Sequence, residues 1–249
     1  ITIKRSTIYA DANTKAGTSR INARAAIGSG CYGAIGNIYI TESKIEAKSE
    51  GGAGIGSGGY YSDDSSGELN WKGGACGLIT IRNSDVTSYG GDGGAGIGGG
   101  WGTPVKDIEI ENSNIKAEGS SIAYTYTDGN TIYQGAAGIG GGWSESCEKI
   151  YIDNSTVDAS GRESSAGIGS SGSYNKYAKN WDASVKGSIE IGSSTVKARG
   201  GSGGAGIGAG EGATFDSGTE IIFRGDCKID ATGGVGGAGI GGGKAGYDD

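Results

Sequence analysis

The side chains best suited to chemistry are four tryptophans that all follow the same kind of motif. Each lies in the loop that follows a copy of the tetrapeptide Ala-Gly-Ile-Gly. These tryptophans are Trp71, Trp101, Trp143 and Trp181. Tyr60, Tyr61, Tyr174 and Tyr177 lie in the same loops. An aromatic ring presents a flat apolar face to the C–H side of a sugar, and indole N–H or phenol O–H groups can hydrogen-bond. The pattern therefore predicts an aromatic edge that binds a poly- or oligosaccharide.

Trp101 and Trp143 follow the same Gly-Gly-Gly sequence, so we expect the two rings to lie nearly stacked at this edge. Replacing both by alanine should then abolish binding and leave the fold intact. Nearby carboxylates such as Asp63 and Asp64 are suited to bind sugar hydroxyls. The alternative interpretation is that the aromatic rings fold back and cover an open side of the protein.

The chain has no histidine, which excludes a Ser-His-Asp triad, a Cys-His dyad and a His-ligated zinc. A polysaccharide lyase or glycosidase would need clustered or paired carboxylates. The best-placed acids, Glu109 and Glu190, are two repeats apart in the pattern described below. We therefore favour a non-catalytic module and keep such an enzyme as an alternative. No cofactor is expected; Ca²⁺ at Asp63 and Asp64 is the one candidate, although no ligand run resembles an EF-hand loop.

The four cysteines match no zinc motif in their spacing. Cys31 and Cys76 fall on the same edge of adjacent repeats, which makes a disulfide between them one prediction. Cys76 and Cys147 are two repeats apart, too far for a bridge. The alternative is that the cysteines are small buried thiols.

Two short motifs alternate along the whole chain and indicate the elements that must position these residues. Ala-Gly-Ile-Gly begins at Ala53, Ala95, Ala137, Ala166, Ala205 and Ala238, with a degenerate copy at Ala25. Between these copies come Ile-x-Ile triplets, which begin at Ile1, Ile38, Ile79, Ile108, Ile150 and Ile189, with a looser copy at Ile221. A serine follows three residues after most triplets, and a β-branched residue follows two positions later. Only the lengths of the loops between the motifs vary.

Strong β-formers in period-2 pairs, with insertions confined to loops, predict a parallel β-solenoid. Each repeat supplies three short strands, which gives an all-β parallel β-helix of about seven rungs in a single domain over residues 1–249. The general preference for right-handed crossovers favours a right-handed coil. The isoleucines should then stack into columns inside the coil.

The glycines of Ala-Gly-Ile-Gly allow two interpretations. If alanine and isoleucine point inward, both glycines point outward and leave a bare face on which a glycan, a second sheet or another copy could dock. Alternatively, the glycines adopt backbone angles at a sharp corner that other residues disfavour.

These motifs resemble the glycine-rich AGIGGG-type repeats of bacterial surface proteins, many of which carry names of the carbohydrate-binding-domain kind. The matching pieces include Ala95–Gly100, Ala137–Gly142 and Ala238–Gly243, together with Ile189–Ile191 and Val196–Ala198. The resemblance covers nearly the whole chain and implies a parallel β-helix at the bacterial surface. This sequence departs from the pattern in its Asn-Ser corners and its longer aromatic loops.

The remaining composition limits partners and location. There are 28 Asp and Glu against 21 Lys and Arg, a net charge of −7, and no basic cluster, so no nucleic-acid partner is expected. No apolar run approaches the ~18 residues of a membrane span. The chain opens at Ile1 within a strand-like pattern, and we expect a piece of a larger extracellular or cell-surface protein.

The alternative to an adhesive module is a structural or fibre module that self-associates through the glycine face or the solenoid ends.

Overall fold

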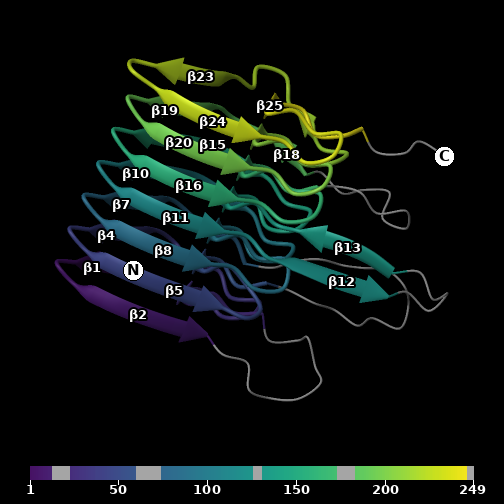
Figure 1. The fold of residues 1–249 in the computed structure, drawn as a ribbon. Helices are drawn as coiled ribbons and strands as arrows, with labels where there is room; N and C mark the ends of the chain where they lie inside the picture. Colours follow the sequence, from purple (N-terminus) through teal and green to yellow (C-terminus); the bar gives the residue numbers. More distant parts are fainter. Residues whose placement is uncertain (13–22, 60–73, 126–130, 173–182, 246–249) are drawn as a thin grey trace.

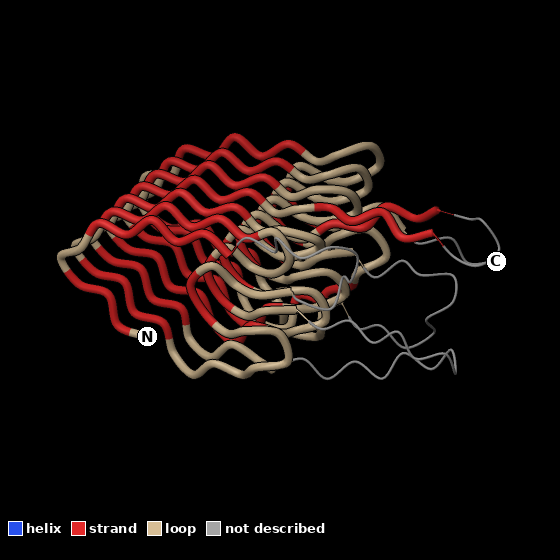
Figure 2. The backbone as a smooth tube through the Cα atoms, turned by 90° about the horizontal axis from the view of Figure 1, so that it is seen from below, coloured by secondary structure: helices blue, strands red, loops and turns tan. Residues whose placement is uncertain are grey.

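The chain winds into a parallel β-helix, as predicted. The computed structural model describes residues 1–12, 23–59, 74–125, 131–172 and 183–245 (Figure 1). Strands stack in steps from the N-terminal to the C-terminal end, and loops of uneven length leave the stack at one side (Figure 2). Within the described residues there is no helix that could cross a membrane.

Three parallel sheets form the walls of the coil. Sheet A contains the Ile-x-Ile strands β1 (Thr2–Lys4), β4 (Ile38–Thr41), β7 (Ile79–Arg82), β10 (Val105–Glu111), β15 (Cys147–Asp153), β19 (Ile189–Gly192) and β23 (Ile221–Arg224), with β18 (Ser184–Val185) and β22 (Thr214–Phe215) beside them. Sheet B contains β2 (Thr7–Ala12), β5 (Lys44–Ser49), β8 (Asp85–Tyr89), β11 (Asn114–Glu118), β16 (Thr156–Ser160), β20 (Thr195–Arg199) and β24 (Lys228–Thr232). Sheet C contains β3 (Ile27–Gly28), β6 (Ile55–Gly56), β9 (Ile97–Gly98), β14 (Ile139–Gly140), β17 (Ile168–Gly169), β21 (Ile207–Gly208) and β25 (Ile240–Gly241).

One strand from each sheet makes a rung, and the seven rungs are numbered from the N-terminus. Rung 4 also carries an antiparallel hairpin, β12 (Ser121–Thr125) with β13 (Thr131–Gly135), which projects from the stack (Figure 1).

Isoleucine columns fill the coil. Ile38, Ile79, Ile108, Ile150 and Ile189 lie in register on adjacent strands of sheet A and are buried. Sheet B contributes a β-branched column and, two positions on, a column of alanines in which Ser88 replaces alanine in rung 3. Side chains alternate in and out along each strand, so one register satisfies every rung. Ile229 pairs with Val196 after one extra residue at the corner, as the sequence predicted.

The bare glycine face does not exist in the described residues. In rungs 2 to 6 the Ala-Gly-Ile-Gly glycines are buried. The motif bends at its first glycine and then forms a two-residue strand of sheet C, and the amide of Ala137 donates to the carbonyl of Gly141 across it at 3.0 Å. Gly140 has φ +131°, and a Cβ there would lie 2.0 Å from the carbonyl oxygen of Gly169 in the next rung. The corner interpretation of these glycines is therefore the correct one, and docking on a glycine face loses its basis.

Candidate functional site

Trp101 and Trp143 contact each other but do not face solvent. Their ring centroids are 4.7 Å apart at an interplanar angle of 67°, an edge-to-face pair. Only 2% of Trp101 and 5% of Trp143 is exposed. The amide of Trp143 donates to the carbonyl of Gly93 at 2.8 Å, which ties the residue to the turn of the preceding rung. The expectation of exposed, sugar-stacking rings is wrong for this pair, because both rings are buried.

The other predicted residues of the aromatic edge lie outside the described residues. These are Trp71, Trp181, Tyr60, Tyr61, Tyr174, Tyr177, Asp63 and Asp64. The described part of that edge contains a hollow of about 540 Å³. Its wall includes the strand column of Ile35, Cys76 and Val105, and Lys106 and Glu148 stand at its charged side.

The predicted disulfide between Cys31 and Cys76 is not present, and both residues are thiols. The in-register neighbour of Cys76 in rung 2 is Ile35, whereas Cys31 lies four residues earlier, in the preceding turn. Cys76 is separated from Cys147 by Val105, as the repeat spacing predicted. Burial raises the pKa of Cys76 to about 12 and raises that of Cys147 further, so both are inert interior thiols.

The corner between sheets A and B has a regular local structure, which corresponds to the recurring Asn-Ser pairs in the sequence. The residue after the Ile-x-Ile strand of rungs 1 to 6 has positive φ: Arg5, Glu42, Asn83, Asn112, Asn154 and Ser193. Asparagine tolerates this left-handed conformation better than most residues, which explains its recurrence here. The chain thereby turns through the corner in two residues and enters sheet B.

A ladder of buried serines holds this corner together. Each serine hydroxyl donates to the carbonyl two residues before it, as Ser113 does to Glu111 at 2.7 Å. It also accepts from the amide of the serine one rung earlier, as Ser113 Oγ does from Ser84 N at 3.1 Å. The ladder comprises Ser6, Ser43, Ser84, Ser113, Ser155 and Ser194. Every link has the same direction, from the amide of one rung to the hydroxyl of the next.

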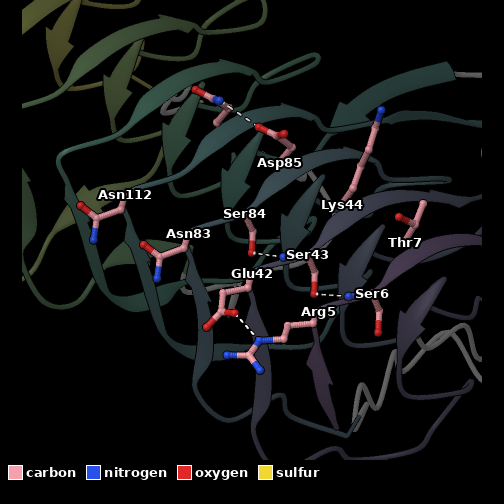
Figure 3. A pocket seen from close by; sticks show the side chains of 11 residues that line it. Arg5, Ser6, Thr7, Glu42, Ser43, Lys44, Asn83, Ser84, Asp85 and Asn112 are labelled. Atoms are coloured by element: carbon pink, nitrogen blue, oxygen red, sulfur yellow. Dashed lines mark hydrogen bonds and ion pairs between the residues drawn. The ribbon is translucent and has the colours of Figure 1, made fainter.

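An open groove of about 770 Å³ runs along this corner across rungs 1 to 4 (Figure 3). Its lining is polar throughout and comprises Arg5, Ser6, Thr7, Glu42, Ser43, Lys44, Asn83, Ser84, Asp85, Asn112 and Asn114. The serines lie at its floor, while the corner residues and the first residues of the sheet B strands stand on either side of them (Figure 3). We call this feature the corner groove.

Some of these side chains are fixed by neighbours and others remain available. Arg5 Nε donates to Glu42 at 2.5 Å, and this hydrogen bond, with the positive charges of Arg5 and Lys4, lowers the pKa of Glu42. Asn114 donates to Asp85 at 2.8 Å. By contrast, the side chains of Lys44 and Asn83 bond to nothing else in the described chain. The groove therefore offers the Lys44 ammonium group and the Asn83 amide beside a floor of serines whose hydroxyls are held by backbone hydrogen bonds.

This donor set suits recognition better than catalysis. Glu42, one of the two carboxylates that line the groove, is paired with Arg5 and is held ionised. Within the described residues no three His, Cys, Asp or Glu side chains gather as a metal site. The groove was not predicted from the sequence, although the Asn-Ser corners and the serine three residues after most triplets indicate the corner that forms it.

The comparison with protein families agrees with the fold. A family model described as a beta helix repeat matches residues 38–59, 79–101 and 150–172. Each matched segment covers one rung from its sheet A strand to the end of its Ala-Gly-Ile-Gly bend. Neither the search of curated proteins nor the search of solved structures found a match.

Proposed function

We propose that the chain is a non-catalytic, extracellular glycan-binding module, with an adhesive role at the cell surface. The observation that carries this proposal is the corner groove, an elongated hollow that crosses four rungs and is lined by polar residues. Rungs repeat every ~4.8 Å, which is close to the length of one sugar unit. A chain of three or four sugars laid along the groove would meet, at each unit, one corner residue, one serine and the first residue of one sheet B strand.

The chemistry of the lining favours an uncharged or weakly charged glycan. Two cations, Arg5 and Lys44, are balanced by two anions, Glu42 and Asp85, so the groove has no net charge. Amides and hydroxyls hydrogen-bond sugar hydroxyls as both donors and acceptors. The predicted aromatic loops remain part of the proposal as a second contact region, through Trp71, Trp181, Tyr60, Tyr61, Tyr174, Tyr177, Asp63 and Asp64.

A glycan array followed by titration calorimetry tests the proposal. Lys44→Ala together with Asn83→Ala removes the two available groups of the groove and should weaken binding at least about tenfold, because each lost hydrogen bond costs ~0.5–1.5 kcal/mol or more when a charge takes part. Lys197→Ala together with Thr195→Ala is the matched control in rung 6, beyond the groove, and should bind like the wild type. A wild-type protein that binds no glycan would refute the proposal.

Two further outcomes separate the alternatives. If Tyr60→Ala and Tyr61→Ala abolish binding while the groove variants do not, the aromatic loops are the site and the groove is not. Shortening of a polysaccharide by the wild-type protein, with Ca²⁺ supplied, would show the lyase or glycosidase alternative instead.

A further inference from the structure

Rung 3 of the corner groove has an amide on one wall and a carboxylate on the other. Asn83 and Asp85 stand on either side of Ser84 at the floor (Figure 3). The Asn83 amide has no hydrogen-bond partner in the described chain. Asp85 Oδ1 accepts from Asn114 at 2.8 Å, which leaves Oδ2 for a ligand. A group that lies across rung 3 would therefore meet an N–H donor on one side and a carboxylate acceptor on the other.

The corner residues next to Asn83 already have partners. Glu42 in rung 2 accepts from Arg5, and Asn112 in rung 4 accepts from Asn154 Nδ2 at 2.6 Å. Asn83 lies between this ion pair and this amide pair and belongs to neither. The bond between Asn112 and Asn154 shows that one amide at this corner can take another amide as its partner. A ligand amide would give Asn83 the same kind of partner.

We propose that the glycan in the corner groove contains an N-acetylated amino sugar, whose acetamido group lies across rung 3 between Asn83 and Asp85. This inference rests on the proposed glycan-binding function. The acetamido group is a trans amide, so its C=O and N–H point in opposite directions. The C=O accepts from Asn83 Nδ2 on one wall, and the N–H donates to the carboxylate of Asp85 on the other. A hydroxyl group has its donor and its acceptor on one atom and does not span the two walls.

The charges of the groove disfavour the charged relatives of this sugar. Lys44 is in register with Asp85 on the adjacent strand of sheet B. The ammonium group of an unacetylated amino sugar would thus be attracted by Asp85 and repelled by Lys44, two effects that largely cancel at similar distances. A carboxylated sugar in rung 3 would be repelled by Asp85 and, one rung away, by Glu42. Repulsion of the wrong ligand contributes to specificity as attraction of the right one does, and a neutral amide is not repelled.

Titration calorimetry with three β1,4-linked tetrasaccharides tests the proposal. They are tetra-N-acetylchitotetraose, its deacetylated form and cellotetraose, which differ only in carrying an acetamido, an amino or a hydroxyl group at carbon 2 of the sugars. The wild-type protein should bind the acetylated compound at least about tenfold more tightly than either of the others, because only the acetamido group makes both hydrogen bonds and one of them is to a charged group.

Variants of the two walls assign this preference to rung 3. Asn83→Gly and Asp85→Asn each remove one contact and should each reduce the preference for the acetylated compound over cellotetraose at least about threefold. Glycine adopts the φ of +49° at position 83 without strain, so the corner keeps its shape. Lys44→Ala should narrow only the gap between the acetylated and deacetylated compounds. Thr195→Ala with Lys197→Ala, in rung 6, is the control and should bind all three compounds like the wild type.

The outcomes distinguish this inference from the proposed function. A protein that binds glycans on the array, but binds cellotetraose or the deacetylated compound as tightly as the acetylated one, or binds none of the three, would overturn the acetamido assignment and leave the glycan-binding proposal in place. A preference that persists unchanged in Asn83→Gly and Asp85→Asn would place recognition of the acetamido group outside rung 3 and also overturn it. Binding to no glycan at all would refute the proposed function, and this inference with it.

Discussion

At the scale of single residues, the positions of the tryptophans could be predicted from the sequence, but the burial of their rings could not. Their placement after Gly-Gly-Gly in Trp101 and Trp143 was readable, and so was their mutual contact. The direction of the rings was not, because a side chain after several glycines follows no period-2 rule. Burial makes this pair part of the packing, which is the alternative that remained open at the level of the sequence.

We expect Trp143→Ala to lower the free energy of unfolding by ~3–5 kcal/mol, the usual cost of removing a buried tryptophan ring. Urea unfolding followed by circular dichroism measures this change. Tyr9→Ala is the control, since Tyr9 is exposed on the outer side of β2, and it should change stability by less than about 1 kcal/mol. A Trp143→Ala protein as stable as the wild type would contradict the buried packing.

At the scale of the elements, the sequence predicted the three strands of each rung, their order and their register, but it did not predict the β12–β13 hairpin or the short strands β18 and β22. Ile-x-Ile over Ile-x-Ile permits one register, because a slip by one residue would turn every isoleucine outward. Side-chain partners were less predictable. Lys116 lies in register with Asp158, yet Lys116 Nζ pairs with Glu118 and Asp158 pairs with Arg199. A long exposed side chain can pair with any of several neighbours, whereas a buried β-branched side chain fits in only one position.

The serine ladder is an element-scale feature whose loss should be measurable. Ser113→Ala leaves the amide of Ser84 without its Oγ acceptor and the carbonyl of Glu111 without its hydroxyl donor. Both groups are at a buried corner, so we expect a loss of ~1–3 kcal/mol in the free energy of unfolding. Thr156→Ala, an exposed residue at the start of β16, is the control and should cost less than about 1 kcal/mol. Equal effects of the two substitutions would show that the ladder adds nothing to stability.

At the scale of the whole molecule, the coil is a one-dimensional stack, so its stability should vary along its length. In such a stack each rung contacts only its neighbours, and the middle rungs gain two interfaces where the end rungs gain one. Rung 4 and rung 5 bury their inward residues fully, whereas Ile8 of rung 1 and Ile229 of rung 7 are half-buried. The fold alone therefore predicts a gradient of opening free energies from the ends to the centre.

Amide hydrogen exchange of the wild-type protein, measured by mass spectrometry, should reveal this gradient. We expect β10, β11, β15 and β16 to exchange slowest, because opening them requires separating two rung interfaces, and β1, β2, β23 and β24 to exchange fastest. Uniform protection along the monomer would mean that the seven rungs open as one cooperative unit, in which case the nearest-neighbour description of this coil is wrong.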